Sequence, residues 1–370
     1  MGRVVSGVGN RRSVVRLSLS VWGLASAVGI AGCASLWDGF GIDNSQSCEV
    51  TPSLCSATQR CSPDSHRCED LDAGVSGDGS VDQGPVDLSQ SSWLPVSSGT
   101  SLDLYSVWGT SSGAAWAVGS TGTILHWESS SSTWSAMQSP TSVNLYDVWG
   151  SDAQNIYAVG SSGTIVRYDG TNWKSQSSPQ AITLLSIWGL DDSHIWAVGM
   201  SGQLLTKGSG SSWNQLSSTS AENLYGLWGS SESNMWAVGA SSTVVRSSGS
   251  GWLTESAGAG ATSVLFGVWG LDKQRMWAVG SQGVVRMWNG SAWSPVSTPA
   301  DSATSLRDVH GMDAKNIWVV GEKGTILYFD GSSWTRQESG TQNTLYGIFR
   351  AGSSDLWVVG EKGTILRRTL

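Results

Sequence analysis

Histidines, the side chains that most often serve as bases or metal ligands, are few and scattered in this sequence. The four are His66, His126, His194 and His310, and none stands in a motif that pairs a base with a nucleophile or groups metal ligands. Glycoside hydrolysis needs a positioned acid, and the pattern singles none out. We therefore expect no catalytic residue, no metal site and no cofactor, and the sequence favours a protein that is not an enzyme.

Cysteine offers a different chemistry, and the first of the five cysteines follows an export signal. Residues 1–16 carry four arginines and no acidic residue, and an apolar run of 16 residues, Leu17–Gly32, comes next. A membrane span needs about 20 residues, so this run is typical of a signal peptide over residues 1–32. It ends in Ile30-Ala31-Gly32-Cys33, which resembles the lipobox of bacterial lipoproteins. The resemblance implies cleavage before Cys33 and acylation of Cys33, palmitate included.

The residue after Cys33 bears on where the protein is anchored. In the sorting rule of Gram-negative bacteria, Asp at this place retains a lipoprotein in the inner membrane, but the residue here is Ala34. We expect a lipid anchor in the outer membrane. The alternative is a plain secretory signal with a chance cysteine, which also exports the protein.

The other four cysteines, Cys48, Cys55, Cys61 and Cys68, lie close together in residues 33–68. In an exported chain, an even number of clustered cysteines predicts two disulfides, with three connectivities left open. Their spacings lack the close pairs of a zinc knuckle, which makes a metal site the weaker alternative. We expect a small segment that two disulfides stabilise.

An acidic stretch follows at residues 69–92. Its aspartates stand among Gly, Ser and Val, and Asp78–Asp82 lacks the alternating carboxylates of a calcium loop. A solvated linker is the better interpretation. Residues 33–92 hold ten acidic and two basic residues, whereas residues 93–370 are nearly neutral, with 19 and 15. This balance argues against nucleic acid as a partner, since phosphate contacts need positive charge.

The remaining chain, residues 93–370, repeats itself. A Trp-Gly landmark recurs every 39 to 41 residues, and ten residues after each landmark comes the Val of a Val-Gly pair, without exception in seven copies. The landmark positions are Trp108, Trp149, Trp188, Trp228, Trp269, His310 and Phe349. Units of about 40 residues with four short strands are typical of propeller blades.

Each repeat predicts four strands, as in Leu104–Gly109, Trp116–Gly119, Thr123–Trp127 and a last strand that opens at a lone Trp. Seven such lone tryptophans occur, but the first, Trp93, precedes the first complete repeat, and the last repeat ends with its third strand, Thr364–Arg367. We therefore predict an all-β, seven-bladed propeller in which the segment around Trp93 completes the last blade. Such closure hides strand edges that would otherwise pair with other chains.

The repeats resemble those of the photosystem II stability/assembly factor-like propellers, a BNR-type family. The segments Ile195-Trp196-Ala197-Val198-Gly199 and Gly163-Thr164-Ile165 carry the resemblance over residues 93–370. The Asp-box turn is one residue short, as in Asp169-Gly170-Thr171-Asn172-Trp173. The resemblance implies the propeller fold and leaves the function open, because fold does not fix function.

Two sets of residues are candidate binding sites. The turns between the second and third strands carry Glu322-Lys323 and Glu361-Lys362 in the last two repeats, where earlier turns are small or neutral. Trp127 and Trp288 fall outside the recurring Trp slots, which leaves them free to be exposed and to stack on sugars. The other tryptophans are expected to pack between blades.

From these observations we expect a monomeric, lipid-anchored envelope protein whose propeller serves as a protein-interaction or scaffold module. A carbohydrate-binding lectin of the cell surface is the alternative, and a sialidase-like glycosidase comes third. The expected partner is accordingly a protein or glycan of the cell envelope, in addition to the membrane that holds the anchor.

Overall fold

The computed structural model describes residues 59–61, 68–70, 92–248, 251–260, 262–352 and 355–370. The chain divides into two compact units, residues 1–83 and residues 84–370. The signal segment, Cys33, Cys48, Cys55 and most of the acidic stretch lie outside the described residues, so their predicted roles stay predictions. Within the described ranges, the chain forms no helix with the length and apolar character that a bilayer span requires.

The first unit contributes one small described element. Strand β1 (Gln59–Cys61) pairs antiparallel with β2 (Cys68–Asp70), and the register places Cys61 opposite Cys68. This backbone pairing is compatible with the predicted Cys-rich segment and leaves the disulfide connectivity open.

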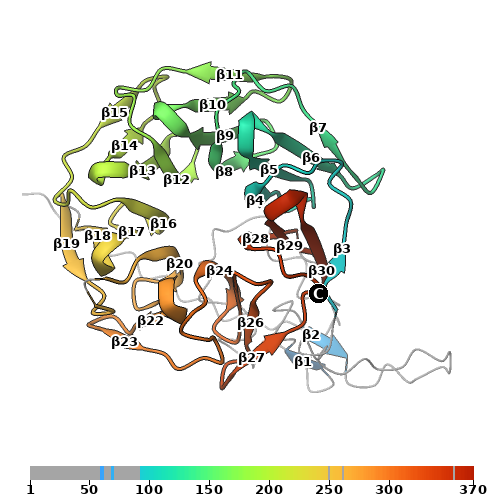
Figure 1. Cartoon of the computed structure of the whole chain (residues 1–370), viewed down its shortest axis with the longest axis vertical. Coiled ribbons are helices and arrows are strands. Elements are labelled where there is room, and N and C mark those ends of the chain that lie inside the picture. Colours follow the sequence, from blue (N-terminus) through green and yellow to red (C-terminus); the bar gives the residue numbers. More distant parts are fainter. Residues whose placement is uncertain (1–58, 62–67, 71–91, 249–250, 261, 353–354) are drawn as a thin grey trace, which may run out of the picture. The chain divides into compact units, whose positions relative to one another are not determined.

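The second unit is an all-β ring of seven four-stranded antiparallel sheets around a central channel, which confirms the predicted seven-bladed propeller (Figure 1). In each blade the first strand lies innermost and the fourth outermost. The strands of the first four blades are β4 (Leu104–Gly109), β5 (Ala115–Gly119), β6 (Ile124–Glu128) and β7 (Thr133–Ala136); β8 (Leu145–Asp152), β9 (Asn155–Gly160), β10 (Ile165–Tyr168) and β11 (Trp173–Gln176); β12 (Leu184–Asp191), β13 (His194–Gly199), β14 (Leu204–Lys207) and β15 (Trp213–Gln215); β16 (Leu224–Ser231), β17 (Asn234–Gly239), β18 (Thr243–Ser247) and β19 (Trp252–Ser256). The strands of the last three blades are β20 (Leu265–Asp272), β21 (Arg275–Gly280), β22 (Val285–Trp288) and β23 (Trp293–Pro295); β24 (Leu306–Asp313), β25 (Asn316–Gly321), β26 (Ile326–Phe329) and β27 (Trp334–Gln337); β28 (Leu345–Ala351), β29 (Asp355–Gly360), β30 (Ile365–Thr369) and β3 (Leu94–Pro95).

The second strand of each blade is buried from its second residue onward, and in three blades over its whole length. In β5 every residue from Ala115 to Gly119 is buried, and the same holds for β17 and β29. Each blade packs face to face against a neighbour on either side, so both faces of its middle strands are covered. This is why these strands have a continuous apolar sequence and no alternation of apolar and polar residues.

The Trp-Gly landmark is a contact between neighbouring blades. The ring of Trp108 lies over Gly150 of the next blade, where an added Cβ would come within 2.8 Å of it. The ring of Trp149 lies over Gly189 in the same way, at 2.5 Å. Gly270 and Gly311 receive the rings of Trp228 and Trp269 in the same way, so at four junctions the pair recurs because the Trp needs a residue without a side chain in the following blade.

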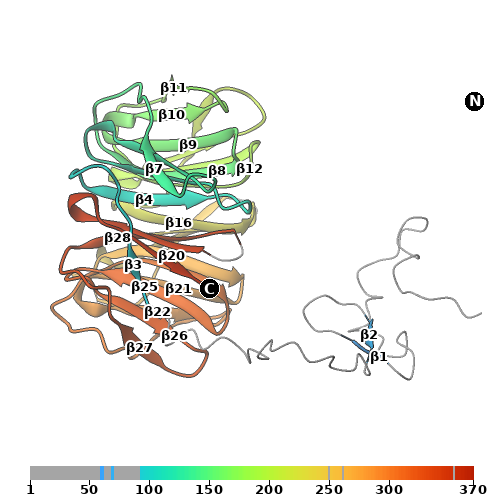
Figure 2. The ribbon, with the colours of Figure 1, turned by 90° about the vertical axis from the view of Figure 1, so that its right-hand side faces the viewer.

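The N-terminal segment completes the last blade, as the count of tryptophans predicted. Strand β3 pairs with β30 and forms the outermost strand of the sheet β28-β29-β30-β3 (Figure 2). Trp93 is 5 % exposed, and its indole NH donates to Oε1 of Gln337 at 3.0 Å. The fully buried Arg368 donates to the same oxygen at 2.7 Å, and its guanidinium lies 5.8 Å from the centre of the Trp93 ring. The ring of blades is therefore closed through a buried polar and aromatic cluster.

Candidate functional site

The innermost strands of the seven blades surround a channel with a cavity of about 140 Å³. Its lining comes from β4, β8, β12, β16, β20, β24 and β28, which present equivalent positions of the repeat to the channel. A site can therefore be described ring by ring along these strands.

The first ring is mostly aromatic and lies at the end of the channel where the turns between second and third strands converge. We call it the collar, and its members are Tyr105, Tyr146, Leu185, Tyr225, Phe266, Arg307 and Tyr346. All seven are half-buried. The Tyr105 ring lies 5.4 Å from both the Tyr146 ring and the Tyr346 ring.

The cation of the collar is Arg307, between Phe266 of the fifth blade and Tyr346 of the seventh. The guanidinium carbon of Arg307 lies 4.5 Å from the centre of the Phe266 ring, and Phe266 in turn lies 5.4 Å from Tyr225. Arg307 also donates to Oε1 of Glu322 at 2.5 Å. The charge of Arg307 is thus balanced by a neighbouring carboxylate.

The next ring, one residue further along each strand, is built from small residues and two carboxylates. Its members are Ser106, Asp147, Ser186, Gly226, Gly267, Asp308 and Gly347. We call it the carboxylate ring. The two aspartates stand in the second and sixth blades, and they differ in how their oxygens are satisfied.

Asp147 has serines on both sides. Its carboxylate accepts hydrogen bonds from the hydroxyls of Ser106 and Ser186, both at 2.7 Å, and from the backbone amides of Val148 and Ile187. Burial raises the pKa of Asp147, and these four hydrogen bonds oppose that shift.

Asp308 has glycines on both sides, Gly267 and Gly347. Its carboxylate accepts only the backbone amides of Val309, at 2.8 Å, and Ile348, at 2.9 Å. Burial raises the pKa of Asp308 to about 7, against the pull of these amides, and the charge of Asp147 adds to the rise.

The charged turns that the sequence singled out lie beside the collar. Glu322 accepts the Ser305 amide and Arg307, and Glu361 accepts the Thr344 amide at 3.0 Å and the hydroxyl of Tyr346 at 3.3 Å. Burial and the nearby carboxylate of Glu361 raise the pKa of Tyr346 to about 12. Both glutamates are half-buried and bonded within the fold, so as members of the predicted binding site they act by holding the collar in place.

The two lysines of these turns are exposed. Lys323 and Lys362 have φ of 56° and 54°, a left-handed conformation that residues other than glycine adopt at a cost. The amide of Lys362 donates to Oδ1 of Asp103 at 2.8 Å, which ties the last blade to the first. The equivalent residue has positive φ in all seven turns, and six of these turns are short 3-10 turns such as η9 (Glu361–Gly363).

The opposite end of the channel is lined by the landmark residues themselves. His310 and Phe349, which replace Trp in the last two blades, lie with ring centres 4.8 Å apart. Burial, together with the charge of Arg350, lowers the pKa of His310 to about 3, so its imidazole is neutral at physiological pH. His310 is half-buried in the wall, as expected for a substitution within the repeat.

The structure corrects the expectation for Trp127 and Trp288. Their exposed fractions are 3 % and 8 %, and both rings pack between blades. The Trp127 ring lies 4.7 Å from that of Trp357, and the Trp288 ring lies 5.2 Å from that of Trp236. They fill a space between neighbouring sheets that shorter side chains fill elsewhere, so they offer no surface for a sugar.

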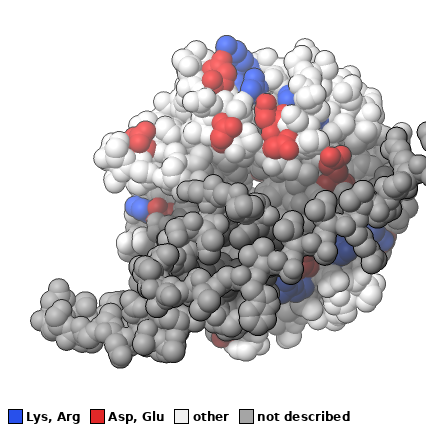
Figure 3. All heavy atoms as spheres, turned by 180° about the vertical axis from the view of Figure 1, so that it is seen from behind, with Lys and Arg blue, Asp and Glu red and all other residues white. Residues whose placement is uncertain are grey.

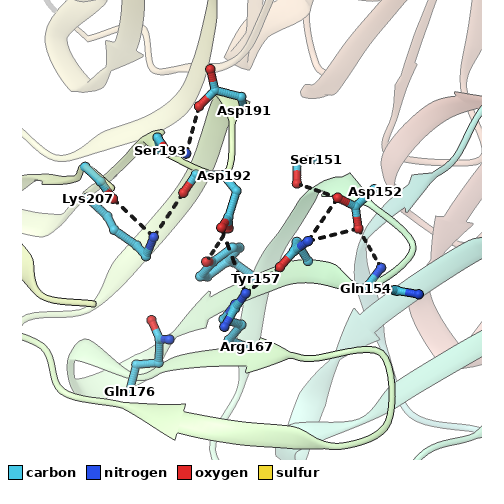
Figure 4. A network of polar contacts seen from close by, with 12 residues as sticks. Ser151, Asp152, Gln154, Tyr157, Arg167, Gln176, Asp191, Asp192, Ser193 and Lys207 are labelled. Carbon is cyan, nitrogen blue, oxygen red and sulfur yellow. Dashed lines mark hydrogen bonds and ion pairs between the residues drawn. The ribbon is translucent and has the colours of Figure 1, made fainter. Parts of the chain in front are cut away.

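A polar network joins the second and third blades near the far ends of their strands (Figure 4). Tyr157 donates to Oδ1 of Asp192 at 2.7 Å, and Arg167 lies 3.9 Å from the other oxygen of that carboxylate. The buried Lys207 donates to the backbone carbonyl of Asp192 at 3.0 Å. Burial and the contact with Asp192 raise the pKa of Tyr157. The side chains of this network bond mainly to one another and to the backbone of the same two blades, so we assign the network to the packing of the blades.

No group of three or more His, Cys, Asp or Glu side chains suited to hold a metal ion occurs within the described part of the chain. On the face shown in Figure 3, the part that grey residues do not cover carries acidic and basic side chains near one another rather than a patch of one sign. The channel and its collar are consequently the best-defined candidate site, and sequence analysis found only its rim, the turns with Glu322 and Glu361. The signal that it missed is the pair of variable positions between the constant Leu of each first strand and the Val, Ile or Leu three residues after it.

The fold and the channel define a class, the seven-bladed β-propellers with a lined central channel. No family model matches the sequence, and no curated relative matches it either. Solved structures do match. YCF48 bound to D1 peptide aligns with a TM-score of 0.62 and 17 % identity, over 80 % of this chain and 100 % of that one.

Two further structures show how widely this fold is shared. YCF48 from Cyanidioschyzon merolae aligns with a TM-score of 0.61 and 17 % identity, over 75 % of this chain and 99 % of that one. Virginiamycin B lyase from Staphylococcus aureus aligns with a TM-score of 0.67 and 13 % identity, over 75 % of this chain and 99 % of that one. At such identities the likeness shows the fold alone, and the class contains both a peptide-bound protein and an enzyme.

Proposed function

We propose that the protein is a non-catalytic, lipid-anchored envelope protein whose propeller binds a protein partner at the collar end of its channel. The observation that carries the proposal is the collar, a nearly closed ring of half-buried aromatic side chains at a channel mouth. Tyrosine and phenylalanine supply large contact areas with few torsions to fix, which is why aromatic side chains are enriched in binding interfaces.

The comparison with known structures supports this proposal in a limited way. YCF48 has the same fold and has been solved with a bound peptide, so propellers of this class include peptide binders. The lectin alternative depended on Trp127 and Trp288, which are buried, and no observation in the described residues favours a glycosidase.

Placing a photo-crosslinking residue at Lys362 tests which face binds. This exposed residue lies in the turn whose Glu361 contacts the collar. We expect the full-length protein in cells to give a discrete protein adduct from position 362. The Tyr346→Ala variant should reduce that adduct by about tenfold, because truncating a central interface tyrosine commonly costs more than about 1.4 kcal/mol.

The matched control is the same crosslinker at Lys273, an exposed residue in the hairpin between β20 and β21 at the other end of the channel. Position 273 should give no adduct. An adduct from 273 and none from 362 would place the partner on the opposite face and overturn the proposal.

The anchor has its own test, the Cys33→Ser variant. A triacylated cysteine holds a protein on a membrane almost irreversibly, since each buried CH₂ contributes about 0.8 kcal/mol. We expect the variant to move from the membrane fraction to the soluble fraction, whereas Cys48→Ser stays with the membrane. If Cys33→Ser remains membrane-bound, the lipid anchor at Cys33 is wrong.

A further inference from the structure

We propose that the channel binds a cationic side chain, a lysine or arginine of the partner protein, which passes the collar and reaches Asp308. This inference deepens the proposed function and rests on it, because it names what the collar end of the channel recognises. Three features of the channel support this inference: the unused lone pairs of the Asp308 carboxylate, the arrangement of the aromatic rings, and the balance of charge.

Asp308 has acceptor capacity that the fold leaves unused. A carboxylate offers about four acceptor sites. Asp147 receives four hydrogen bonds from within the fold, two of them from the serines beside it. Asp308 receives two, because the neighbouring positions of the carboxylate ring are Gly267 and Gly347. The remaining lone pairs of Asp308 lie at the wall of the cavity, and a donor that arrives along the channel would satisfy them.

The collar provides a path that suits a cation. Tyr346, Tyr105 and Tyr146 form a continuous run of rings, with centres 5.4 Å apart. Aromatic faces attract ammonium and guanidinium groups within about 6 Å of the ring centre. Arg307, in the blade next to Tyr346, already shows this contact with Phe266, at 4.5 Å. Among the described residues, no Lys or Arg lies in this way over the three tyrosines, so their ring faces are left to a ligand.

A lysine or arginine side chain is long enough to reach Asp308 from outside the collar, and the cavity is large enough to hold it. The collar and the carboxylate ring are successive residues of the same strands, which rise about 3.3 Å per residue. A lysine or arginine side chain spans that step while its backbone stays outside. The cavity of about 140 Å³ accommodates one such side chain with little room beyond it, whereas a folded segment could not enter.

The charge of the lining selects a cation. The charged groups of the cavity wall are Asp147, Asp308 and Arg307, and Arg307 is paired with Glu322 outside the wall. Glu361 adds a further carboxylate at the rim, and His310 at the far end is neutral. An entering cation meets more carboxyl groups than cations in the wall, and its arrival favours their ionised form, which strengthens the attraction and fixes orientation.

The burial that raises the pKa of Asp308 also makes that pKa sensitive to a cation arriving in the channel. A carboxylate buried without a cation keeps its proton more firmly, and an arriving ammonium group lowers that pKa again by linkage. Binding should therefore weaken as the pH falls from 8 to 6. The groups that face Asp308 and its channel are Asp147, whose pKa is also raised, Arg307, the collar tyrosines and His310, and His310 titrates well below this window.

Short peptides test the inference directly. The probe is acetyl-Gly-Gly-Lys-Gly-Gly-amide, with the arginine and the uncharged norleucine peptides as comparisons, titrated into the purified full-length protein by calorimetry. We expect the lysine or arginine peptide to bind and the norleucine peptide to bind at least tenfold more weakly. Asp308→Asn should lose at least tenfold in affinity, Asp147→Asn should lose less, and lowering the pH from 8 to 6 should weaken binding severalfold in the wild type only.

A matched control distinguishes the specific role of Asp308 in peptide binding from a general effect of the protein's charge. Glu338→Gln removes one carboxylate from an exposed position just after β27, the outermost strand of the blade that holds Asp308, and should leave affinity unchanged. Equal losses for Asp308→Asn and Glu338→Gln, or equal binding of the norleucine peptide, would overturn the inference. Spermidine that binds more tightly than the peptides, with the same dependence on Asp308, would assign the site to a free polyamine and would also overturn it.

Failure of this inference can be distinguished from failure of the proposed function. If the crosslink from position 362 forms and depends on Tyr346 but no peptide depends on Asp308, the partner binds at the collar and the cationic side chain is wrong. If the peptide binds through Asp308 while position 362 gives no adduct, the ligand class is right and the protein partner at this face is wrong.

Discussion

Deleting residues 93–99 is expected to lower the free energy of unfolding of the propeller by about 4 kcal/mol, although these residues precede the first repeat. The deletion removes Trp93, which is 5 % exposed, and burial of a large aromatic residue contributes about 3–5 kcal/mol in comparable cores. It also removes the amide of Val96, which donates to the carbonyl of Ile365 at 2.9 Å, and so exposes the edge of β30.

The loss should spread beyond the last blade. Trp93 and Arg368 share the oxygen of Gln337, a residue of the preceding blade, so the deletion leaves a buried guanidinium with a disrupted set of contacts. Truncating a residue next to a buried charge costs more than its own contacts. We expect a lower midpoint of thermal unfolding, measured by circular dichroism, together with a tendency to aggregate through the exposed strand.

The control is a deletion of equal length, residues 84–90, which lie within the predicted linker. It should leave the unfolding midpoint unchanged. A chain without residues 93–99 that melts like the intact protein would contradict the closure as the source of stability. The unfolding midpoint of the Trp93→Phe variant should lie between those of the two deletions, because phenylalanine keeps most of the buried area and loses the hydrogen bond to Gln337.

Gly160→Ala is expected to destabilise the fold by about 3 kcal/mol, near the upper end of what overpacking costs. Gly160 is the glycine of a Val-Gly pair, and an added Cβ would lie 2.0 Å from the carbonyl oxygen of Asn144. That oxygen also accepts the amide of Ser161 at 3.0 Å, so it is held in place and cannot move aside. A backbone atom gives way far less readily than the end of a flexible side chain, and the strain therefore falls on the first strand of the blade.

Urea denaturation measures this loss, and Gly210→Ala provides the matched control. No atom lies within 4 Å of an added Cβ at Gly210, so this change should alter the free energy of unfolding by less than about 0.5 kcal/mol. Equal effects of the two substitutions would show that the lost flexibility of the unfolded chain, and not the close approach at Gly160, decides the result.

The interval of ten residues between the Trp-Gly and Val-Gly pairs could be interpreted from the sequence because the glycine of the Val-Gly pair has one structural role in all seven blades, and the Trp-Gly contact recurs at four junctions between blades. Gly150 accepts the ring of Trp108, and Gly160 lies against the first strand of its own blade. Such constraints act on single positions at fixed spacing, so they leave a periodic signal. The count of lone tryptophans located the closing strand for the same reason, since the Trp93 slot recurs in every blade.

The candidate site is harder to recognise in the sequence than the fold, because its positions do not repeat the same residue. Collar positions carry Tyr, Leu, Phe or Arg, and the carboxylate ring carries Ser, Asp or Gly, so neither set repeats. Only the ring of blades brings seven such variable positions around one axis. The sequence pointed to the turns of Glu322 and Glu361, but it could not show that both carboxylates bond to backbone amides and to the collar.

The sequence alone determined the number of blades, the strands within each blade and the way the ring closes, because these follow from local patterns repeated at a constant interval. The tertiary structure decided which side chains are exposed. In a propeller both faces of a blade are covered by its neighbours, so alternation along a strand does not distinguish buried from exposed positions, and Trp127 and Trp288 proved to be buried between sheets. The tertiary structure also decided that Asp308 keeps unused acceptor sites while Asp147 does not. The serines beside Asp147 and the glycines beside Asp308 come from blades that are adjacent in space and about 40 residues apart in the chain.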